Sequence, residues 1–198
     1  MTTFDFGADL ILENERVRLE PLLLEHFDEL LPICLAAPDL LQYSPSPFGT
    51  ADQLKSYIAT AVGGRQNGQR YPFITFDKQN QAYVGSTSFG NISNPHQRLE
   101  IGWTWLAPAA QRTGLNRNAK FLQLSYAFEE LGFVRVEFKA DARNAPSRTA
   151  MEAIGAQYEG CLRSHTAMPG GFRRDTVYYS ILAEEWPQVK QERFPHLG

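Results

Sequence analysis

The sequence has little cysteine and no long apolar run, and each shortage excludes a class of protein. Cys34 and Cys161 are the two cysteines among 198 residues, too few for a disulfide framework and without CxxC spacing. We therefore expect a reducing, cytoplasmic setting. No stretch approaches the roughly 20 apolar residues that span a bilayer. The opening MTTFDFGADL has acidic residues and no apolar core, which predicts neither a signal peptide nor a membrane partner.

Basic charge is also scarce. Lysine and arginine number 19 against 22 acidic residues, for a net charge of -3, which argues against a nucleic-acid partner. His26, His96 and His196 show no metal-ligand spacing with one another or with the cysteines, so we expect no metal. Apolar residues make up 43% of the chain, and no repeat or linker divides it. We expect a single domain over residues 1–198, with its core at about 16–186.

Hydrophobic periodicity switches repeatedly between two and about 3.6 residues, which predicts an α/β or α+β fold. The order predicts a mixed, mostly antiparallel seven-stranded sheet with helices on both faces and a central βαβ crossover. In the strand at 98–106, Leu99, Ile101, Trp103 and Trp105 are expected to share one face. Strands are expected near 16–20, 72–76, 82–89, 98–106, 134–138, 156–168 and 175–182, and helices near 24–37, 51–64, 116–131 and 145–154.

The loop of the crossover holds the clearest candidate site. It runs from Gln111 to Asn116, straight from a strand into a helix whose first N–H groups lack partners within the helix. Gly114 permits close backbone approach, and Arg112 and Arg117 could add charged contacts. This composition favours a phosphate or pyrophosphate site. An ordinary βα turn without a ligand remains the alternative, since the loop is neither a Walker motif nor GxGxxG.

Four motifs then occur in order along the chain. They are Glu100–Pro108 (EIGWTWLAP), Gln111-x-x-Gly114-x-Asn116, Asn144-x-x-Ser147 and Ile154-Gly155-Ala156-x-x-Glu159-Gly160. Together they resemble the GNAT family of acetyl-CoA-dependent N-acetyltransferases, and more narrowly its branch of ribosomal-protein N-terminal acetyltransferases. The resemblance covers about residues 16–186. Asn116 stands where the family usually has glycine or alanine, but asparagine is also favoured at a helix start.

The resemblance implies acetyl-CoA as co-substrate. Its pantetheine arm would lie where the strands at 98–106 and 134–138 diverge, along Thr104, Trp105 and Leu106, and would touch Asn144 and Ser147. Its pyrophosphate would bind the backbone amides of Gln111, Arg112, Thr113, Gly114, Leu115 and Asn116.

Catalysis then needs a neutral amine, an oxyanion donor and a proton for the leaving thiolate. By resemblance, Glu100 is the candidate base. The alternatives are a surface glutamate or a structural partner of Arg98. Ser147 is the candidate acid, unless it is simply a helix residue capped by Asn144.

Other side chains compete for these roles. Tyr126, Tyr178 and Tyr179 are alternative acids, although they also suit the core or the sheet. His165 and Arg163 share a strand face and could line the acceptor cleft, or could simply be solvated. The resemblance places the loop around Tyr43 and Phe48 at the acceptor site.

The sequence leaves three functions open. The first is an N-acetyltransferase acting by direct amine attack on a protein N-terminus or a small amine. The second is a non-catalytic acyl-CoA-binding or regulatory module, and the third is a structural domain without a co-substrate. The resemblance also implies a homodimer.

Overall fold

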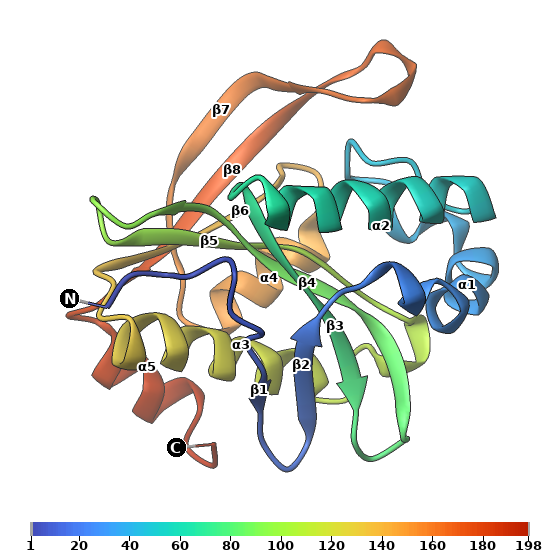
Figure 1. Cartoon of the computed structure of the whole chain (residues 1–198). Helices are drawn as coiled ribbons and strands as arrows, with labels where there is room; N and C mark the ends of the chain where they lie inside the picture. The colour runs from blue at the N-terminus through green and yellow to red at the C-terminus, as the bar shows by residue number, and fades with distance from the viewer. Residues whose placement is uncertain (1, 198) are drawn as a thin grey trace.

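The computed structural model describes residues 2–197. It contains one eight-stranded sheet in the order β1-β2-β3-β4-β5-β6-β8-β7. Helices α1 and α2 cover one face, and α3, α4 and α5 cover the other (Figure 1). The strands are β1 Leu12–Glu13, β2 Val17–Pro21, β3 Arg70–Asp77, β4 Ala82–Ser93, β5 Arg98–Leu106, β6 Arg135–Asp141, β7 Gln157–Ala167 and β8 Arg173–Leu182. The helices are α1 Phe27–Ala36, α2 Ala51–Gln66, α3 Leu115–Ser125, α4 Ala145–Ala153 and α5 Trp186–Arg193.

The mixed, mostly antiparallel sheet is confirmed, but the expected number of seven strands is wrong. The additional strand is β1, a two-residue edge strand that pairs with β2 through Leu12 and Leu19. Both of these leucines are buried, so packing rather than a sequence pattern creates the strand. A segment this short carries no detectable alternation.

The central crossover produces the parallel pair β5 and β6, whose ladder is short. It covers Arg98 to Glu100 of β5 and Arg135 to Glu137 of β6. Beyond these residues β5 pairs with β4, and β6 pairs with β8. The expected divergence of the two strands is therefore present, and it leaves a gap between them at the end nearer α3.

A bulge interrupts β5 at Trp103, whose φ is 51°. The register with β4 shifts at this point. Leu99 and Ile101 pack in the core beneath α3, whereas Trp105 packs with α1 and α2 on the opposite face. The expectation that Leu99, Ile101, Trp103 and Trp105 share a face is therefore wrong, because the extra residue reverses the alternation.

The core extends beyond residues 16–186 at both ends. Phe4 is buried against Tyr71 and Phe89, and Arg65 donates to the Phe6 carbonyl. At the other end Trp186 begins α5, and the buried Phe194 follows the helix. Aromatic contacts over long sequence separations hold these segments, which explains why local periodicity missed them.

The helix expected at 116–131 is divided. α3 ends at Ser125 and continues as the π-helical turn η4, Tyr126–Glu130. Gly132 follows with a φ of 68°, as expected of a residue just past a helix end. No helix within residues 2–197 combines the length and apolarity that crossing a bilayer requires.

Candidate active site

The start of α3 presents a concentrated set of hydrogen-bond donors. Between Arg112 and Arg117, no backbone N–H has a hydrogen-bond partner among residues 2–197. The first intrahelical bond in this segment is from the Asn118 N–H to the Gly114 carbonyl. Gly114 has a φ of 85°, and its surface is open, since no atom lies within 4 Å of where a Cβ would stand. Convergent free donors at a helix N-terminus fit a diphosphate.

The side chains of this loop mostly hold the loop itself. The Thr113 hydroxyl donates to the Ala110 carbonyl at 2.8 Å. Arg112 is exposed with a φ of 60°, so its guanidinium is available to a ligand. Arg117 instead donates to the Arg193 carbonyl and lies over the Phe194 ring. Its expected contact with a phosphate therefore competes with an interaction that ties α3 to the C-terminal segment.

Thr104, Trp105 and Leu106 are adjacent in β5 but face three different environments. Thr104 is exposed. Trp105 is buried on the α2 face, where its indole N–H donates to Tyr57 at 3.0 Å. Leu106 is buried on the α3 side, and its backbone carbonyl accepts from the side-chain amide of Gln111 at 3.0 Å. The Thr104 hydroxyl contacts Thr87 of β4 and Lys120 of α3, both at 2.8 Å.

Glu100 lies where β5 and β6 separate, and it is only 6% exposed. Its Oε2 accepts from Asn91 at 2.6 Å and forms an ion pair with Lys139 at 2.7 Å. Both alternatives for this residue are wrong: it is not a surface side chain, and Arg98 pairs with Glu137 instead. No hydrogen bond to its Oε1 is found within the described part of the chain.

Gly102 is the neighbour that keeps this free oxygen accessible. A Cβ added at Gly102 would stand 2.9 Å from Glu100 Oε1, closer than such contacts allow. The missing side chain therefore leaves space beside a buried carboxylate oxygen, as a base that receives a proton from a substrate requires.

Asn144 and Ser147 meet at the start of α4. The Asn144 side-chain oxygen accepts from the Ser147 backbone N–H at 3.1 Å, so the helix-capping alternative is correct as a description of Asn144. The Ser147 hydroxyl has no partner in residues 2–197, and the side chain is half-buried. Capping and contact with a ligand are compatible, because capping occupies a backbone N–H and not this hydroxyl.

The alternative acids differ in accessibility. Tyr179 is fully buried and donates to Glu152 at 2.8 Å, and burial raises its pKa. Tyr126 is half-buried in an aromatic group with Phe4 and Phe89, and burial raises its pKa as well. Tyr178 lies under the Lys139 ammonium, 5.0 Å from the ring centre. Tyr178 therefore contacts the lysine that forms the ion pair with Glu100.

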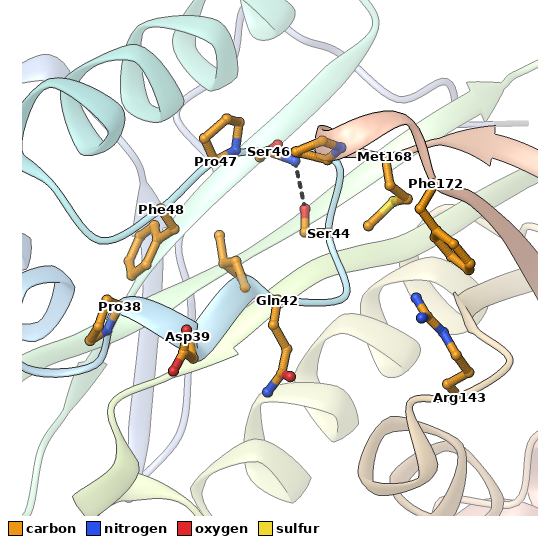
Figure 2. Close-up of a pocket in the computed structure, with 12 residues that line it drawn as sticks. Pro38, Asp39, Gln42, Ser44, Ser46, Pro47, Phe48, Arg143, Met168 and Phe172 are labelled. Carbon is orange, nitrogen blue, oxygen red and sulfur yellow. Dashed lines mark hydrogen bonds between the residues drawn. The ribbon is translucent and has the colours of Figure 1, made fainter.

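A cavity of about 390 Å³ lies on the α1–α2 side of the molecule. Figure 2 shows the loop before α2 on one side of it and Arg143, Met168 and Phe172 on the other. Arg143 forms an ion pair with Asp141 and lies 4.1 Å from the Phe172 ring centre. Arg174 joins the two walls, since it donates to the Tyr43 carbonyl at 3.0 Å.

The expected acceptor residues are distributed around this region. Phe48 lines the cavity, and Tyr43 lies beside it, with its ring 5.9 Å from the Arg143 guanidinium. His165 is exposed on β7 and bonds Thr176 at 3.1 Å. Arg163 is exposed on the same strand, and no ion pair or hydrogen bond of its side chain is found in residues 2–197.

Two buried cations were not anticipated from the sequence. Lys120 of α3 is 6% exposed, and its ammonium group contacts the Thr87 and Thr104 hydroxyls and the Gln123 side-chain oxygen at 2.8 to 3.1 Å. Burial lowers the pKa of Lys120 to about 7. Arg70 of β3 is 8% exposed. The available signal for Lys120 was the spacing of Asn116, Lys120 and Gln123, which places three polar residues along one side of a helix.

No group of three potential metal ligands from His, Cys, Asp and Glu occurs in the part of the chain that the structure describes. The sites that the geometry supplies are the donor-rich start of α3, the gap between β5 and β6, and the buried carboxylate of Glu100.

Most of this chain matches a known protein family. The model of the acetyltransferase (GNAT) domain matches residues 16–157. The uncharacterized N-acetyltransferase YnaD of Bacillus subtilis (strain 168) is 29% identical over 149 residues, which cover 75% of this chain and 83% of YnaD. The putative ribosomal N-acetyltransferase YdaF of the same organism is 36% identical over 106 residues, 54% of this chain and 57% of YdaF. A crystal structure of a GCN5-related N-acetyltransferase from Brucella melitensis superposes with a TM-score of 0.89 at 29% identity, covering 100% of this chain and 90% of that one.

Proposed function

This chain belongs to the acetyltransferase (GNAT) family, and from that membership we propose that it transfers the acetyl group of acetyl-CoA to a primary amine by direct attack. One observation carries the proposal: the unpartnered N–H groups from Arg112 to Arg117 lie at the end of the gap between β5 and β6. A diphosphate needs such donors, and an extended thiol arm needs such a gap. The acceptor is a protein N-terminus or a small amine, and the similarity to YdaF, named as a ribosomal N-acetyltransferase, supports the former.

In this proposal, three parts of the chain bind acetyl-CoA and stabilise the reaction. Loop amides from Arg112 to Asn116 bind the diphosphate, with Arg112 adding charge. The Gln111 N–H was expected among them, but it already donates to the Pro108 carbonyl at 3.2 Å. The β5 backbone near Thr104 to Leu106 aligns the thioester arm and stabilises the developing oxyanion. Asn144 contacts the arm, and the free hydroxyl of Ser147 donates a proton to the leaving thiolate.

Glu100 receives the proton of the attacking amine, because a protonated amine has no lone pair with which to attack. Its Oε2 is held by Lys139 and Asn91, which fixes the orientation of the carboxylate. Its Oε1 is left free for the substrate. No protein nucleophile is required for a direct transfer.

Replacing Glu100 with glutamine should lower kcat/KM about 100-fold or more at neutral pH, while acetyl-CoA binding changes little. The amide keeps the shape of the side chain but cannot take up a proton. Steady-state kinetics from pH 6 to 9, with saturating acetyl-CoA and varied amine, would measure the effect. Glu137→Gln is the matched control, since Glu137 pairs with Glu100 across the ladder but bonds Arg98 and Arg135. An E100Q enzyme with the wild-type pH profile would remove the base role.

The function itself is tested by titration calorimetry with acetyl-CoA, followed by thiol release with a panel of amines and peptides. We expect binding and amine-dependent release. Binding without release would favour the alternative, a non-catalytic acyl-CoA-binding module. Absence of binding would contradict both.

The proposal also covers the location of the protein in the cell and its oligomeric state. The chain acts as one domain in the cytoplasm, supported by Cys34 and Cys161, which form no disulfide in the described structure. A homodimer is part of the proposal, supported by the edge strand β7, where Tyr158 and Leu162 are exposed apolar side chains.

A further inference from the structure

A second cavity, of about 380 Å³, lies against α2 on the same side of the sheet as Glu100. It shares Ser46 and Pro47 with the cavity of Figure 2, so the two are neighbours on either side of the loop before α2. Apart from the prolines, each residue that lines it carries a polar group, and Arg70 is one of them. The lining residues are Pro45, Ser46, Pro47, Asp52, Gln53, Ser56, Tyr57, Thr60 and Arg70.

Arg70 is a buried guanidinium without a carboxylate partner in residues 2–197. Its Nε donates to the Ser88 hydroxyl at 2.8 Å, and one Nη2 hydrogen bonds the Tyr57 hydroxyl at 2.8 Å. Its plane is held over the rings of Trp103 and Tyr57, at 4.9 and 5.2 Å. A guanidinium has five N–H donors, so about three remain for a ligand. A buried cation without a counter-ion is costly, and an anion relieves that cost.

Tyr57 adds one more unpaired hydrogen-bond donor to this cavity. Its hydroxyl oxygen accepts from both Arg70 and the Trp105 indole, and no acceptor for its own hydrogen is found in the described chain. The acidic residue of the wall, Asp52, is exposed on the first turn of α2 and forms no ion pair with Arg70. The helix N-terminus already stabilises that carboxylate. The deep end of the cavity is thus a donor site beside a fixed positive charge.

The sheet register places this site at a defined separation from Glu100. Arg70 pairs with Gly90, and Gly90 pairs with Glu100. The two side chains therefore point to the same face, two strand spacings apart, or roughly 10 Å between backbones. The Trp103 ring lies over Gly90 between them, where a Cβ would approach the ring to 2.3 Å. Gly90 thus allows the indole to form the floor between the cation and the carboxylate.

We propose that Arg70 binds a carboxylate of the acceptor, so that the preferred acceptor is an amine carrying an acidic group several bonds from its nitrogen. The inference rests on the proposed acetyl transfer, with the amine at Glu100. The planar guanidinium matches a carboxylate in two parallel hydrogen bonds. With about 3.5 Å per extended residue, an acidic side chain at the second or third position of a peptide spans this distance.

The test compares matched acids and amides as acceptors. One arm uses C-terminally amidated tetrapeptides with glutamate or glutamine at position two, three or four, and the other uses 6-aminohexanoate against its amide. We expect kcat/KM at least tenfold higher for the acid in one arm, which identifies the source of the carboxylate. Arg70→Met should reduce the acid-to-amide ratio to about one. Equal rates for acids and amides with the wild-type enzyme would overturn the inference.

Two controls separate ligand binding from a structural role. Arg143→Met removes a guanidinium from the neighbouring cavity that already has Asp141 as partner, and it should keep the ratio. R70M should have an unchanged or higher Tm without acceptor, because the methionine removes an uncompensated buried charge. A lower Tm with the ratio intact would assign Arg70 to structure.

If R70M fails to fold, Arg70→Lys keeps the charge without the two-bond geometry and should lower the ratio partly. Absence of thiol release with every acceptor would overturn the proposed function itself.

Discussion

Replacing Gly114 with alanine should weaken acetyl-CoA binding about 10- to 100-fold, which corresponds to about 1.4 to 2.8 kcal/mol. The glycine holds a φ of 85° at the point where the loop amides turn toward the ligand. Alanine is strained there by about 1 to 2 kcal/mol and relaxes toward negative φ, which scatters the N–H groups that the diphosphate requires. Calorimetric titration with acetyl-CoA measures the loss directly.

Gly132 supplies a matched control for this substitution. Its φ is 68°, and, as at Gly114, a Cβ would have no neighbour within 4 Å. Gly132→Ala should therefore cost comparable stability while leaving acetyl-CoA affinity unchanged. Equal affinity losses in the two variants would mean that general destabilisation, and not the geometry of the loop, determines binding.

Replacing Lys120 with methionine should remove a pH dependence of stability that wild-type protein has above pH 7. The folded-state pKa of Lys120 is about 7, against 10.5 for an unperturbed lysine. Between these values the unfolded chain holds a proton that the folded chain gives up, so wild-type stability rises with pH. One such group contributes up to about 1.4 kcal/mol per pH unit. Below pH 7 both states are protonated and the full cost of burying the charge remains.

The sign of the K120M effect should therefore depend on pH. At pH 6 the variant should be more stable than wild type, because it buries no charge. Near pH 9 to 10 it should be less stable, since a neutral amine bonds Thr87, Thr104 and Gln123 and methionine does not. Denaturant unfolding at several pH values measures both. Lys55→Met, on the exposed side of α2, should leave the slope as in wild type; identical slopes for K120M and wild type would contradict the burial argument.

The sequence predicted those features that depend on neighbouring residues. The turn from β5 into α3 and the Asn144 cap of α4 follow from short patterns, and the structure has both. The divergence of β5 from β6 came from the family resemblance and is also present. Local composition and chain order were sufficient for each of these.

The features that were missed depend on contacts between distant segments. Phe4 is buried by residues that lie more than sixty positions away, and Phe194 is held by Phe121. The alternative that paired Glu100 with Arg98 is wrong, because the partner of Glu100 is Lys139, which comes from the next strand of the sheet. The buried state of Arg70 and Lys120 depends on which elements cover them, and no window of the sequence contains that information.

The bulge at Trp103 reverses the faces of the sheet to which the side chains of β5 point. Before it, the even-numbered Glu100 faces the compartment beneath α2, and after it the even-numbered Thr104 faces Lys120 on the opposite side. A single inserted residue thus lets β5 direct its even-numbered side chains first to the Glu100 side of the sheet and then to the Lys120 side. A redesign that assigns the odd and even positions of β5 to fixed faces of the sheet will therefore change the wrong face beyond residue 103.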